Sequence, residues 1–490
     1  MPIPVKSGRL VFSRRLTIFE HQKTIQLTLI KSISGIRGTI GGKPGDSLSP
    51  LDIVKFTSAY AAWVNETYKG KGRARVVIGR DARMSGAMVT GIVTGTLTGS
   101  GIDVTDLGIS TTPTVEMAVT ELKAQGGIIL TASHNPKQWN ALKLLNDKGE
   151  FISEEVGRLI LQKAETDQYT YAEVDGLGEY REEPGFLQRH IALILAMPFV
   201  DKKAIENAGF RVVVDAINSS GAVAVPALLY QLGVKDVTVI NGDMHGNFAH
   251  NPEPLPDHLS ELSGKVRAIK AHLGISVDPD VDRLAFVNEN GEMFGEEYTL
   301  VAVADYILRK KKGNTVSNLS STRALRDVTE AAGGSYSASA VGEVNVVRMM
   351  KETGAVIGGE GNGGVIVPDL HYGRDALAGI AIFLSHLASS GGTMSALKAR
   401  YPAYHISKNK IDLAAGINVD QILSSMAARY KDHPVNTVDG VKIEFGKEWV
   451  HLRKSNTEPI IRIYSESSDS MAADSLARRV MDEIREVAGS

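Results

Sequence analysis

The stretch Gly127-Ile-Ile-Leu-Thr-Ala-Ser-His-Asn-Pro136 joins a short apolar run to a polar corner. The run from Gly127 to Leu130 has the length and composition of a buried strand. Asn135-Pro136 then ends that strand, because the residue before proline avoids the α region and proline has no N–H to donate to a sheet ladder. Ser133 is therefore expected on a loop at the edge of a sheet.

Ser133 has cationic and basic neighbours in the sequence, namely His134, Lys137 and Lys143. A serine hydroxyl is a poor nucleophile unless such neighbours assist it. The same neighbours suit a phosphorylated serine, whose roughly two negative charges need neutralising. The alternative is a polar loop in which Ser133 and Asn135 only cap a turn.

A second polar loop, Asp278-Pro-Asp-Val-Asp-Arg283, follows the expected strand Gly274 to Val277. It carries three carboxylates at alternate positions, which repel one another unless a cation is shared, so Mg²⁺ is the natural occupant. A calcium-binding EF-hand is excluded, because Arg283 stands where that loop needs glycine and the flanks have strand patterns. A solvated acidic turn remains the alternative.

A third loop, Gly358-Gly-Glu-Gly-Asn-Gly-Gly364, surrounds one carboxylate and one amide with glycines. Glycines allow a ligand to approach the backbone, and Glu360 and Asn362 offer acceptors and donors suited to adjacent sugar hydroxyls. A flexible hairpin turn is the alternative.

A fourth loop, Arg453-Lys-Ser-Asn-Thr-Glu-Pro459, lies between two expected strands, Trp449 to Leu452 and Ile460 to Tyr464. A guanidinium with two hydroxyls and an amide suits a phosphate group. A structural turn capped by Asn456 is the alternative.

Similar strands recur at intervals of domain size and indicate an internal repeat. Strands at 75–80, 211–216 and 314–319 each lead into a polar loop and a helical pattern. Later strands at 127–130, 274–277 and 354–357 each precede one of the first three loops. This alternation predicts three similar α/β units with mixed, mostly parallel sheets, whose ligands bind at the carboxyl ends of strands.

Composition sets limits on the class of protein. With 490 residues the chain exceeds what one hydrophobic core supports, and 43% hydrophobic residues with 22% charged residues are typical of a globular protein. A formal charge of -2 offers no footprint for nucleic acid, and zero cysteines exclude disulfides and thiolate metal sites. The apolar run 376–388 is too short to span a bilayer. These features predict a cytoplasmic protein without nucleic-acid or membrane partners.

The pattern divides the chain into five parts. The first, residues 1–26, is a basic extension expected to be disordered. Three α/β domains are predicted over 27–182, 183–292 and 293–400. A smaller α+β domain is predicted over 401–490, where a last helix carries one apolar stripe.

Taken together, the four loops resemble the α-D-phosphohexomutase family, in the family's order and spacing, from Leu29 to the C-terminal helix. The resemblance implies four domains around a central cleft, with Ser133 as the phosphoserine. It implies that Asp278, Asp280 and Asp282 hold Mg²⁺ together with the Ser133 phosphate. The remaining implied site residues are Arg37, His134 and Lys143 beside the phosphoserine, Glu360 and Asn362 at the sugar, and Arg283, Arg453, Ser455, Asn456 and Thr457 at phosphate groups.

The resemblance implies an enzyme that interconverts hexose 6-phosphates and hexose 1-phosphates through a phosphoserine and a hexose 1,6-bisphosphate, which also serves as activator. Its partners would be small-molecule hexose phosphates, and it would be a monomer or a homodimer. The opening Ile30-Lys-Ser-Ile-Ser-Gly-Ile-Arg-Gly38 is similar to members that act on glucosamine phosphate. Many bacterial members carry serine and histidine where this chain has Asn362 and Gly364.

Three alternatives remain open at this point. The first is a phosphoglucomutase/phosphomannomutase of broader specificity. The second is a metal-dependent phosphomonoesterase that uses Ser133. The third loop and the fourth loop, residues 453–459, called here the phosphate clamp, argue against it. The third is a non-catalytic sugar-phosphate-binding protein, which an intact Ser133 and three aspartates disfavour.

Overall fold

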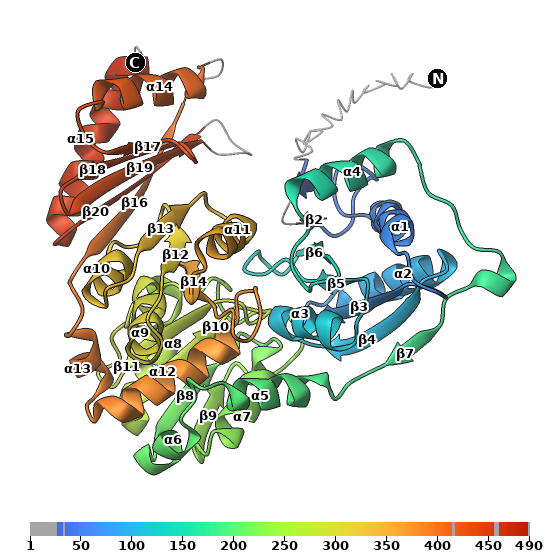
Figure 1. The fold of residues 1–490 in the computed structure, drawn as a ribbon, viewed down its shortest axis with the longest axis horizontal. Coiled ribbons are helices and arrows are strands. Elements are labelled where there is room, and N and C mark those ends of the chain that lie inside the picture. Colours follow the sequence, from blue (N-terminus) through green and yellow to red (C-terminus); the bar gives the residue numbers. More distant parts are fainter. Residues whose placement is uncertain (1–26, 33–34, 414–416, 455–459, 489–490) are drawn as a thin grey trace, which may run out of the picture.

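The computed structural model describes residues 27–32, 35–413, 417–454 and 460–488. The described chain forms four sheets, and each sheet belongs to one domain, called here domains I to IV in chain order. Domains II and III lie in the middle of the molecule, with domain I on one side and domain IV at one end (Figure 1). The predicted four-domain α/β architecture is confirmed. The predicted extension 1–26 lies outside the described residues.

Domain I is built on a seven-stranded sheet, ordered β1-β2-β6-β5-β3-β4-β7. Its first helix begins at Pro50, because Ser49 and Asp52 form a capping box and proline is favoured in the first turn. The elements of domain I are β1 (Ile30–Ser32), β2 (Gly35–Thr39), α1 (Pro50–Thr67), β3 (Arg75–Arg80), α2 (Gly86–Gly99), β4 (Asp103–Ile109), α3 (Thr112–Glu121), β5 (Gly126–Leu130), β6 (Trp139–Leu145), α4 (Glu154–Glu165), the 3₁₀ turn η1 (Val174–Gly176) and β7 (Tyr180–Glu182).

Domain II carries a four-stranded sheet, ordered β11-β10-β8-β9, and begins with two helices. Its elements are α5 (Phe186–Ala196), α6 (Lys202–Ala208), β8 (Arg211–Asp215), α7 (Gly221–Gln231), β9 (Asp236–Ile240), the 3₁₀ turn η2 (Pro256–His258), α8 (Ser260–Ile269), β10 (Leu273–Val277) and β11 (Leu284–Asn288).

Domain III carries another four-stranded sheet, ordered β13-β12-β14-β15. Its elements are α9 (Glu296–Lys310), β12 (Thr315–Asn318), α10 (Ala324–Ala331), β13 (Tyr336–Ser339), α11 (Glu343–Thr353), β14 (Ile357–Glu360), β15 (Gly364–Ile366), α12 (Ala376–Ser390) and α13 (Met394–Lys398).

Domain IV differs from the others, because its five-stranded sheet is antiparallel throughout, in the order β16-β20-β19-β18-β17. Its helices pack against this sheet around a separate core. Its elements are β16 (His405–Asp412), α14 (Val419–Arg429), β17 (Val435–Asn436), β18 (Val441–Phe445), β19 (Glu448–Lys454), β20 (Ile460–Ser467) and α15 (Ser470–Ala488).

The first three domains share one strand topology. Numbering the four shared strands of each sheet along the chain gives the spatial order 4-3-1-2 in every case, with the last strand antiparallel and the others parallel. The three polar loops after β5, β10 and β14 therefore occupy the same place in three similar units, between the third and fourth strands. The predicted repeat is confirmed, and it brings equivalent strand ends to one region.

Domains II and III are joined by a continuous hydrophobic core. Helix α12 lies within it and packs against α5, α6, α7 and α9, and every residue from Ala376 to Leu387 is buried. The ring of Phe383 stacks on Phe286 of domain II with ring centres 4.0 Å apart. A helix that is apolar all round must be buried, which explains the longest apolar run in the sequence.

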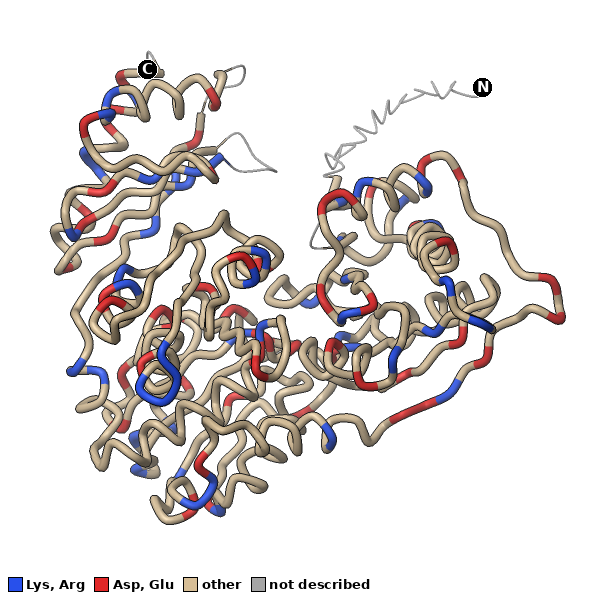
Figure 2. Tube along the Cα trace, viewed as in Figure 1, with Lys and Arg blue, Asp and Glu red and all other residues tan. Residues whose placement is uncertain are grey.

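Charged residues of both signs are spread over all four domains (Figure 2). Among the described residues, no helix combines the length and the apolar character needed to cross a membrane.

Candidate active site

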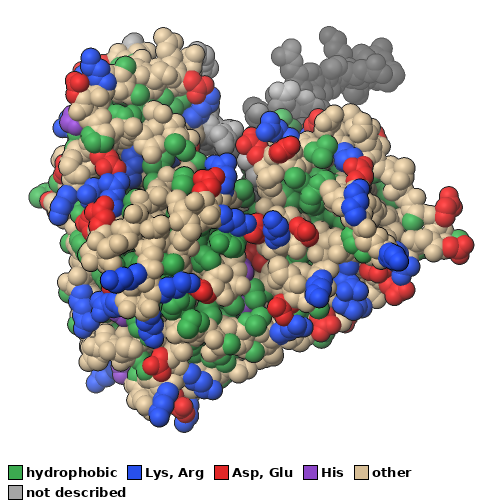
Figure 3. Space-filling view, viewed as in Figure 1, with side chains coloured by type: hydrophobic (Ala, Val, Ile, Leu, Met, Phe, Trp, Pro, Cys, Tyr) green, Lys and Arg blue, Asp and Glu red, His purple; other side chains and the backbone are tan. Residues whose placement is uncertain are grey.

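A cavity of about 850 Å³ lies where domains I, II and III meet. Its lining includes Ser133 and Lys143 from domain I, Arg283 from domain II, and Glu360 and Arg374 from domain III. The space-filling view shows the molecular surface hollowed between domain I and domain IV (Figure 3). The cavity is therefore built from loops that are far apart in the sequence.

Ser133 is buried on the loop after β5 and has a left-handed backbone conformation, with φ of 50°. Such a φ is strained for a residue other than glycine and is concentrated at functional sites. The backbone N–H of Ser133 donates to the Thr131 hydroxyl over 2.9 Å. Its own hydroxyl donates to Asp278 Oδ2 over 2.7 Å, which joins the serine loop to the aspartate loop.

Arg83 holds the serine loop in this shape, a role that the sequence motifs did not reveal. Its guanidinium is fully buried and donates to the backbone oxygens of Ser133, Asn135, Pro136 and Trp139. Asp81 accepts from Arg83 Nε over 3.0 Å and fixes the guanidinium. The available signal was the Arg80-Asp-Ala-Arg83 sequence at the carboxyl end of the first strand of the repeat.

The three aspartates of the second loop lie close together and are buried. The carboxylate of Asp280 accepts from Lys143 Nζ over 2.7 Å and from the Thr112 hydroxyl over 2.5 Å. Asp282 accepts from Arg374 over 2.7 Å, and Asp278 accepts from backbone N–H groups of its own loop. Domains I and III therefore both contribute cations to the aspartate loop.

These aspartates form a group that could hold a metal ion. Asp280 Oδ1 and Asp282 Oδ1 are buried and have no hydrogen-bond partner among the described residues. Burial and the neighbouring Asp280 and Asp282 raise the pKa of Asp278 well above its usual range. Carboxylate oxygens that are buried, crowded and unpaired fit a hard divalent cation such as Mg²⁺.

Positive charge surrounds the Ser133 hydroxyl. Burial and repulsion from Arg283 and Arg37 lower the pKa of His134 to about 2, so this imidazole is neutral near pH 7. Burial alone would lower the pKa of Lys143, but Asp280 and Asp282 outweigh it and raise that pKa. His134 Nδ1 lies 3.4 Å from Ser133 Oγ. The surroundings of the Ser133 hydroxyl therefore suit a bound anion.

In the third loop, Glu360 faces the cavity and Asn362 does not belong to its described lining. Glu360 Oε1 accepts from Asn318 Nδ2 and from the Gly342 N–H, and Oε2 accepts from Arg374. Burial raises the pKa of Glu360, but Arg374 outweighs it and holds that pKa below the usual range. The Asn362 side chain instead accepts from the backbone N–H of Gly364 over 3.1 Å.

Arg374 is the second functional candidate that the motifs did not reveal. This buried guanidinium bonds to three carboxylates, with distances of 2.7 Å to Asp282, 2.8 Å to Glu343 and 2.9 Å to Glu360. A Cβ atom added to Gly364 would lie 2.4 Å from Arg374 Cδ. The absence of a side chain at Gly364 therefore leaves room for Arg374. This dependence could not be predicted from the sequence, because it arises from how the two loops pack.

Arg453 stands apart from Ser133, on β19 of domain IV. Together with Asp439, whose carboxylate lies 2.9 Å from Arg453 Nε, it lines a second cavity of about 600 Å³. Asp439 also accepts from the backbone N–H of Val341, and Val341 lines the Ser133 cavity. Ser455, Asn456 and Thr457, the other predicted residues of this loop, lie outside the described residues.

Comparison with known proteins matches these domains one by one. Family models for phosphoglucomutase/phosphomannomutase match α/β/α domain I over residues 29–170, domain II over 188–291, domain III over 295–404 and the C-terminal domain over 410–483.

Curated relatives cover nearly the whole chain. A phosphoglucomutase/phosphomannomutase of Thermococcus kodakarensis is 34% identical over 89% of this chain and 95% of its own length. A probable phosphoglucosamine mutase of Methanopyrus kandleri is 32% identical over 92% of this chain and 98% of its own. A phosphoglucosamine/phosphogalactosamine mutase of Sulfurisphaera tokodaii is also 32% identical, over 91% and 97%.

Solved structures share the fold. A phosphoglucomutase/phosphomannomutase family protein of Burkholderia thailandensis has a TM-score of 0.81 at 24% identity, covering 95% of this chain and 98% of its own. A phosphomannomutase structure from Thermus thermophilus has a TM-score of 0.77 at 26% identity, covering 93% and 99%. The chain therefore belongs to the phosphoglucomutase/phosphomannomutase family and is a phosphohexomutase.

Proposed function

We propose that this phosphohexomutase interconverts glucosamine 6-phosphate and glucosamine 1-phosphate through a phosphoserine at Ser133. The observation that carries the mechanism is the contact of 2.7 Å between Ser133 Oγ and Asp278, inside a buried group of aspartates and cations. The preference for glucosamine is supported by relatives whose names are phosphoglucosamine mutase. A cytoplasmic location is part of the same proposal.

In the proposed reaction, the phosphoryl group on Ser133 passes to the free hydroxyl of a hexose monophosphate. The bond from phosphorus to Ser133 Oγ breaks as the bond to the sugar oxygen forms, and a hexose 1,6-bisphosphate results. The bisphosphate turns over in the cavity and returns its other phosphoryl group to Ser133. Phosphoryl transfer depends mainly on positioning and charge stabilisation, which suits a serine held in one conformation by Arg83.

Mg²⁺ held by Asp278, Asp280 and Asp282 would supply positive charge to the transferring group. Lys143 bonds to Asp280, so its ammonium group would add positive charge beside the transferring group. Arg37 and Arg283 line the cavity beside His134. These cations would lower the barrier, because fixed positive charge aimed at developing negative charge usually provides most of the rate enhancement in such reactions.

The attacking sugar hydroxyl must lose its proton, and we assign Glu343 as the acceptor. Its side chain lines the cavity at the first residue of α11. Burial and the nearby Asp282 and Glu360 raise the pKa of Glu343 in spite of Arg374, which makes this carboxylate a stronger base than an exposed one. Glu360, whose pKa is lowered, would accept hydrogen bonds from sugar hydroxyls instead.

The phosphate that is not reacting would bind to Arg453 and the loop that follows it. One solved structure of the same fold, an N-acetylphosphoglucosamine mutase of Aspergillus fumigatus, was obtained in complex with GlcNAc-6P and magnesium. Another structure of that enzyme contains glucose 1,6-bisphosphate. By analogy, Mg²⁺ and a hexose 1,6-bisphosphate activator belong to the proposal for this chain.

Turnover of the 6-phosphates of glucosamine, glucose and mannose, each with a catalytic amount of hexose 1,6-bisphosphate, tests the substrate. We expect the highest kcat/KM for glucosamine 6-phosphate. Equal or higher values for glucose or mannose would instead support a phosphoglucomutase/phosphomannomutase of broader specificity, which the Thermococcus relative represents.

Intact-mass analysis after incubation with the bisphosphate tests the phosphoserine. One added phosphoryl group should map to Ser133 and be absent from Ser133→Ala, whereas Ser153→Ala, which changes the helix cap of α4, should retain it. A phosphate on another residue, or full turnover by Ser133→Ala, would overturn the mechanism. Release of free phosphate as the main product would indicate a phosphomonoesterase.

A further inference from the structure

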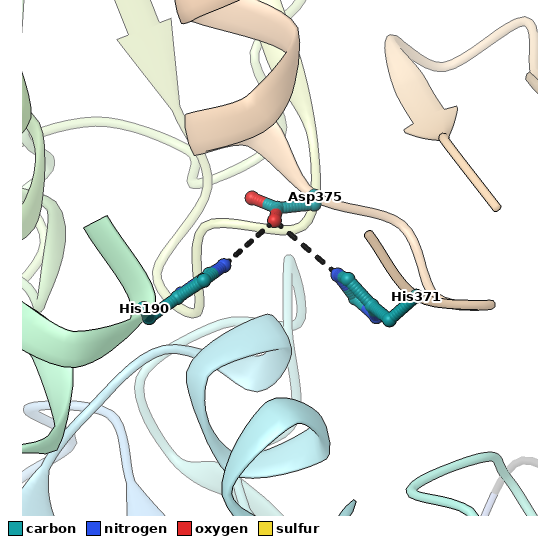
Figure 4. Close-up of side chains that lie close together, drawn as sticks. All are labelled: His190, His371 and Asp375. Carbon is teal, nitrogen blue, oxygen red and sulfur yellow. Dashed lines mark hydrogen bonds and ion pairs between the residues drawn. The ribbon is translucent and has the colours of Figure 1, made fainter. Parts of the chain in front are cut away.

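A second group of metal-ligand side chains lies outside the Ser133 site, where three domains meet. His190 comes from α5 of domain II, and His371 and Asp375 come from the loop before α12 of domain III. Figure 4 shows both imidazole rings directed at one carboxylate. His190 Nε2 lies 2.9 Å from Asp375 Oδ2, and His371 Nε2 lies 3.2 Å from the same oxygen.

The orientation of Asp375 is set independently of the histidines. Its other oxygen, Oδ1, accepts from the backbone N–H groups of Leu377 and Ala378 and caps α12. Oδ2 is thereby held toward the two rings. Candidate ligand atoms of His190, His371 and Asp375 all lie within 4.8 Å of one another.

The far nitrogen of each ring is held by domain I. His190 Nδ1 lies 3.0 Å from the Thr114 hydroxyl, and His371 Nδ1 lies 3.3 Å from Glu116 Oε2, both on α3. A metal-bound histidine almost always has its other ring nitrogen held by a carboxylate, a carbonyl, a water or a similar group, which fixes the ring. Both histidines meet this condition.

Glu116 is a second buried carboxyl group, next to the ring of His371. This side chain is 1% exposed, and its Oε2 lies 3.3 Å from His371 Nδ1. Glu116 and Asp375 place two carboxyl groups in a buried space. A divalent cation bound between the rings would offset the negative charge that these groups carry when they are ionised.

We propose that His190, His371 and Asp375 bind a divalent transition-metal ion of the Zn²⁺ type, supported by Glu116 and Thr114 through the far ring nitrogens. Zn²⁺ binds imidazole nitrogen and carboxylate oxygen at about 2.0–2.2 Å, so tetrahedral ligand atoms stand about 3.3 Å apart. The observed distances from the two ring nitrogens to Asp375 Oδ2 are 2.9 and 3.2 Å, and no two of the three ligand atoms are more than 4.8 Å apart. Two nitrogen ligands favour this class of ion over Mg²⁺.

The ion would act as a structural tie. It would join domains II and III directly and domain I through Glu116 and Thr114. The aspartate loop is close by, since Thr112 at the start of α3 donates to Asp280. The tie would hold the helix that supports the aspartate loop, and it would be distinct from the Mg²⁺ of that loop.

A metal-uptake experiment tests the proposal. Enzyme stripped with a chelator is dialysed against Zn²⁺ in a large excess of Mg²⁺, and bound zinc is measured by elemental mass spectrometry. We expect about one Zn²⁺ per chain in the wild type, in Asp280→Asn and in the control His405→Gln, an exposed histidine of domain IV. His190→Gln and His371→Gln should lose it, and Glu116→Gln should weaken affinity roughly 10- to 100-fold.

X-ray absorption of the zinc-loaded wild type identifies the zinc ligands, even if a histidine variant fails to fold. Two imidazoles in the zinc shell support the proposal, and a shell of oxygens alone overturns it. Uptake that is equal in wild type and both histidine variants, or that is lost in Asp280→Asn, would place the ion on the aspartate loop. A wild type that takes up no Zn²⁺ would mean that protons alone join the two rings to Asp375 and Glu116.

Discussion

The surroundings of Ser133 and those of Arg453 are built in different ways. Around Ser133 the charges are buried and already paired across domain boundaries, as in the contact between Lys143 and Asp280. Arg453 lies on an antiparallel sheet with its own core and lines its own cavity, and its side chain is 23% exposed. The surroundings of Ser133 are therefore built jointly by domains I, II and III. Those of Arg453 belong to domain IV alone.

The contacts that attach domain IV to domain III are mostly polar. Arg326 donates to Glu444 with both terminal guanidinium nitrogens, and Lys442 donates to the backbone oxygen of Leu319. Interfaces of this kind permit relative motion of domains, whereas the continuous core between domains II and III resists it. We therefore expect a rigid reactive centre, to which the phosphate clamp is brought by closure of domain IV.

The largest loss of turnover should come from a substitution in the aspartate loop of the rigid reactive centre. Asp280→Asn removes one charge from the metal group and the partner of Lys143, so turnover should fall on the order of 10³-fold or more. Steady-state kinetics with the matched control Asp236→Asn, an exposed aspartate paired with Arg211, measures this. Activity within tenfold of the wild type, or normal activity in excess chelator, would contradict a metal role for the loop.

Arg374 should give the next largest effect, because it ties the aspartate loop to the third loop. Arg374→Met leaves Asp282, Glu343 and Glu360 buried without their shared cation, which should cost about 3–5 kcal/mol of unfolding free energy. Urea unfolding and kcat/KM should both decline. Gly364→Ala should lower activity in the same direction, because its Cβ would displace the arginine.

Arg309→Met, at an exposed ion pair on α9, is the control for Arg374. Wild-type stability in Arg374→Met would show that the three carboxylates do not depend on this guanidinium. Full activity in Gly364→Ala would show that the glycine is not needed for its placement.

A smaller effect on kcat/KM is expected from a substitution in domain IV. Arg453→Ala should cost about 2–4 kcal/mol, or roughly 30- to 1,000-fold in kcat/KM, by removing a charged contact to phosphate. Both reaction directions should suffer, because the clamp binds whichever phosphate is not reacting. Arg429→Ala, which removes an exposed ion pair with Glu486 outside that loop, is the control. Loss of one direction only would refute a shared clamp.

The smallest effect should appear at the junction of domains III and IV. Burial and the nearby Glu296 and Glu466 raise the pKa of Glu297 from 4.5 to about 8 despite Lys408. The folded protein therefore binds a proton there that the unfolded chain releases, so stability falls as pH rises from about 4.5 to about 8. Glu297→Gln should remove this dependence.

Thermal unfolding of wild type and Glu297→Gln at several pH values measures the difference. The variant keeps an amide oxygen that can accept from the Thr322 N–H, as Glu297 does over 2.9 Å. Parallel pH profiles for the two proteins would show that Glu297 is ionised in the folded state.

Features that depend on local pattern could be predicted from the amino-acid sequence. Helix α12 was visible as an apolar run, and the loops after β5, β10 and β14 were visible as strand ends followed by polar or glycine-rich residues. Local patterns suffice for these features because side-chain periodicity and turn chemistry act within a few residues. The Ser133 and Asp278 loops were found in this way, and their proximity followed only from the repeat and the resemblance.

The pairing of buried charges, by contrast, depends on how the domains pack against one another. Arg83, which follows β3, bonds to the loop of Ser133. Arg374 bonds to Asp282, which lies 92 positions earlier in the sequence. His190 meets Asp375 across 185 positions, and nothing near either residue in the sequence indicates the other. Such pairs depend on how separate α/β units pack, and burial then makes each unpaired charge costly enough that the packing must supply its partner.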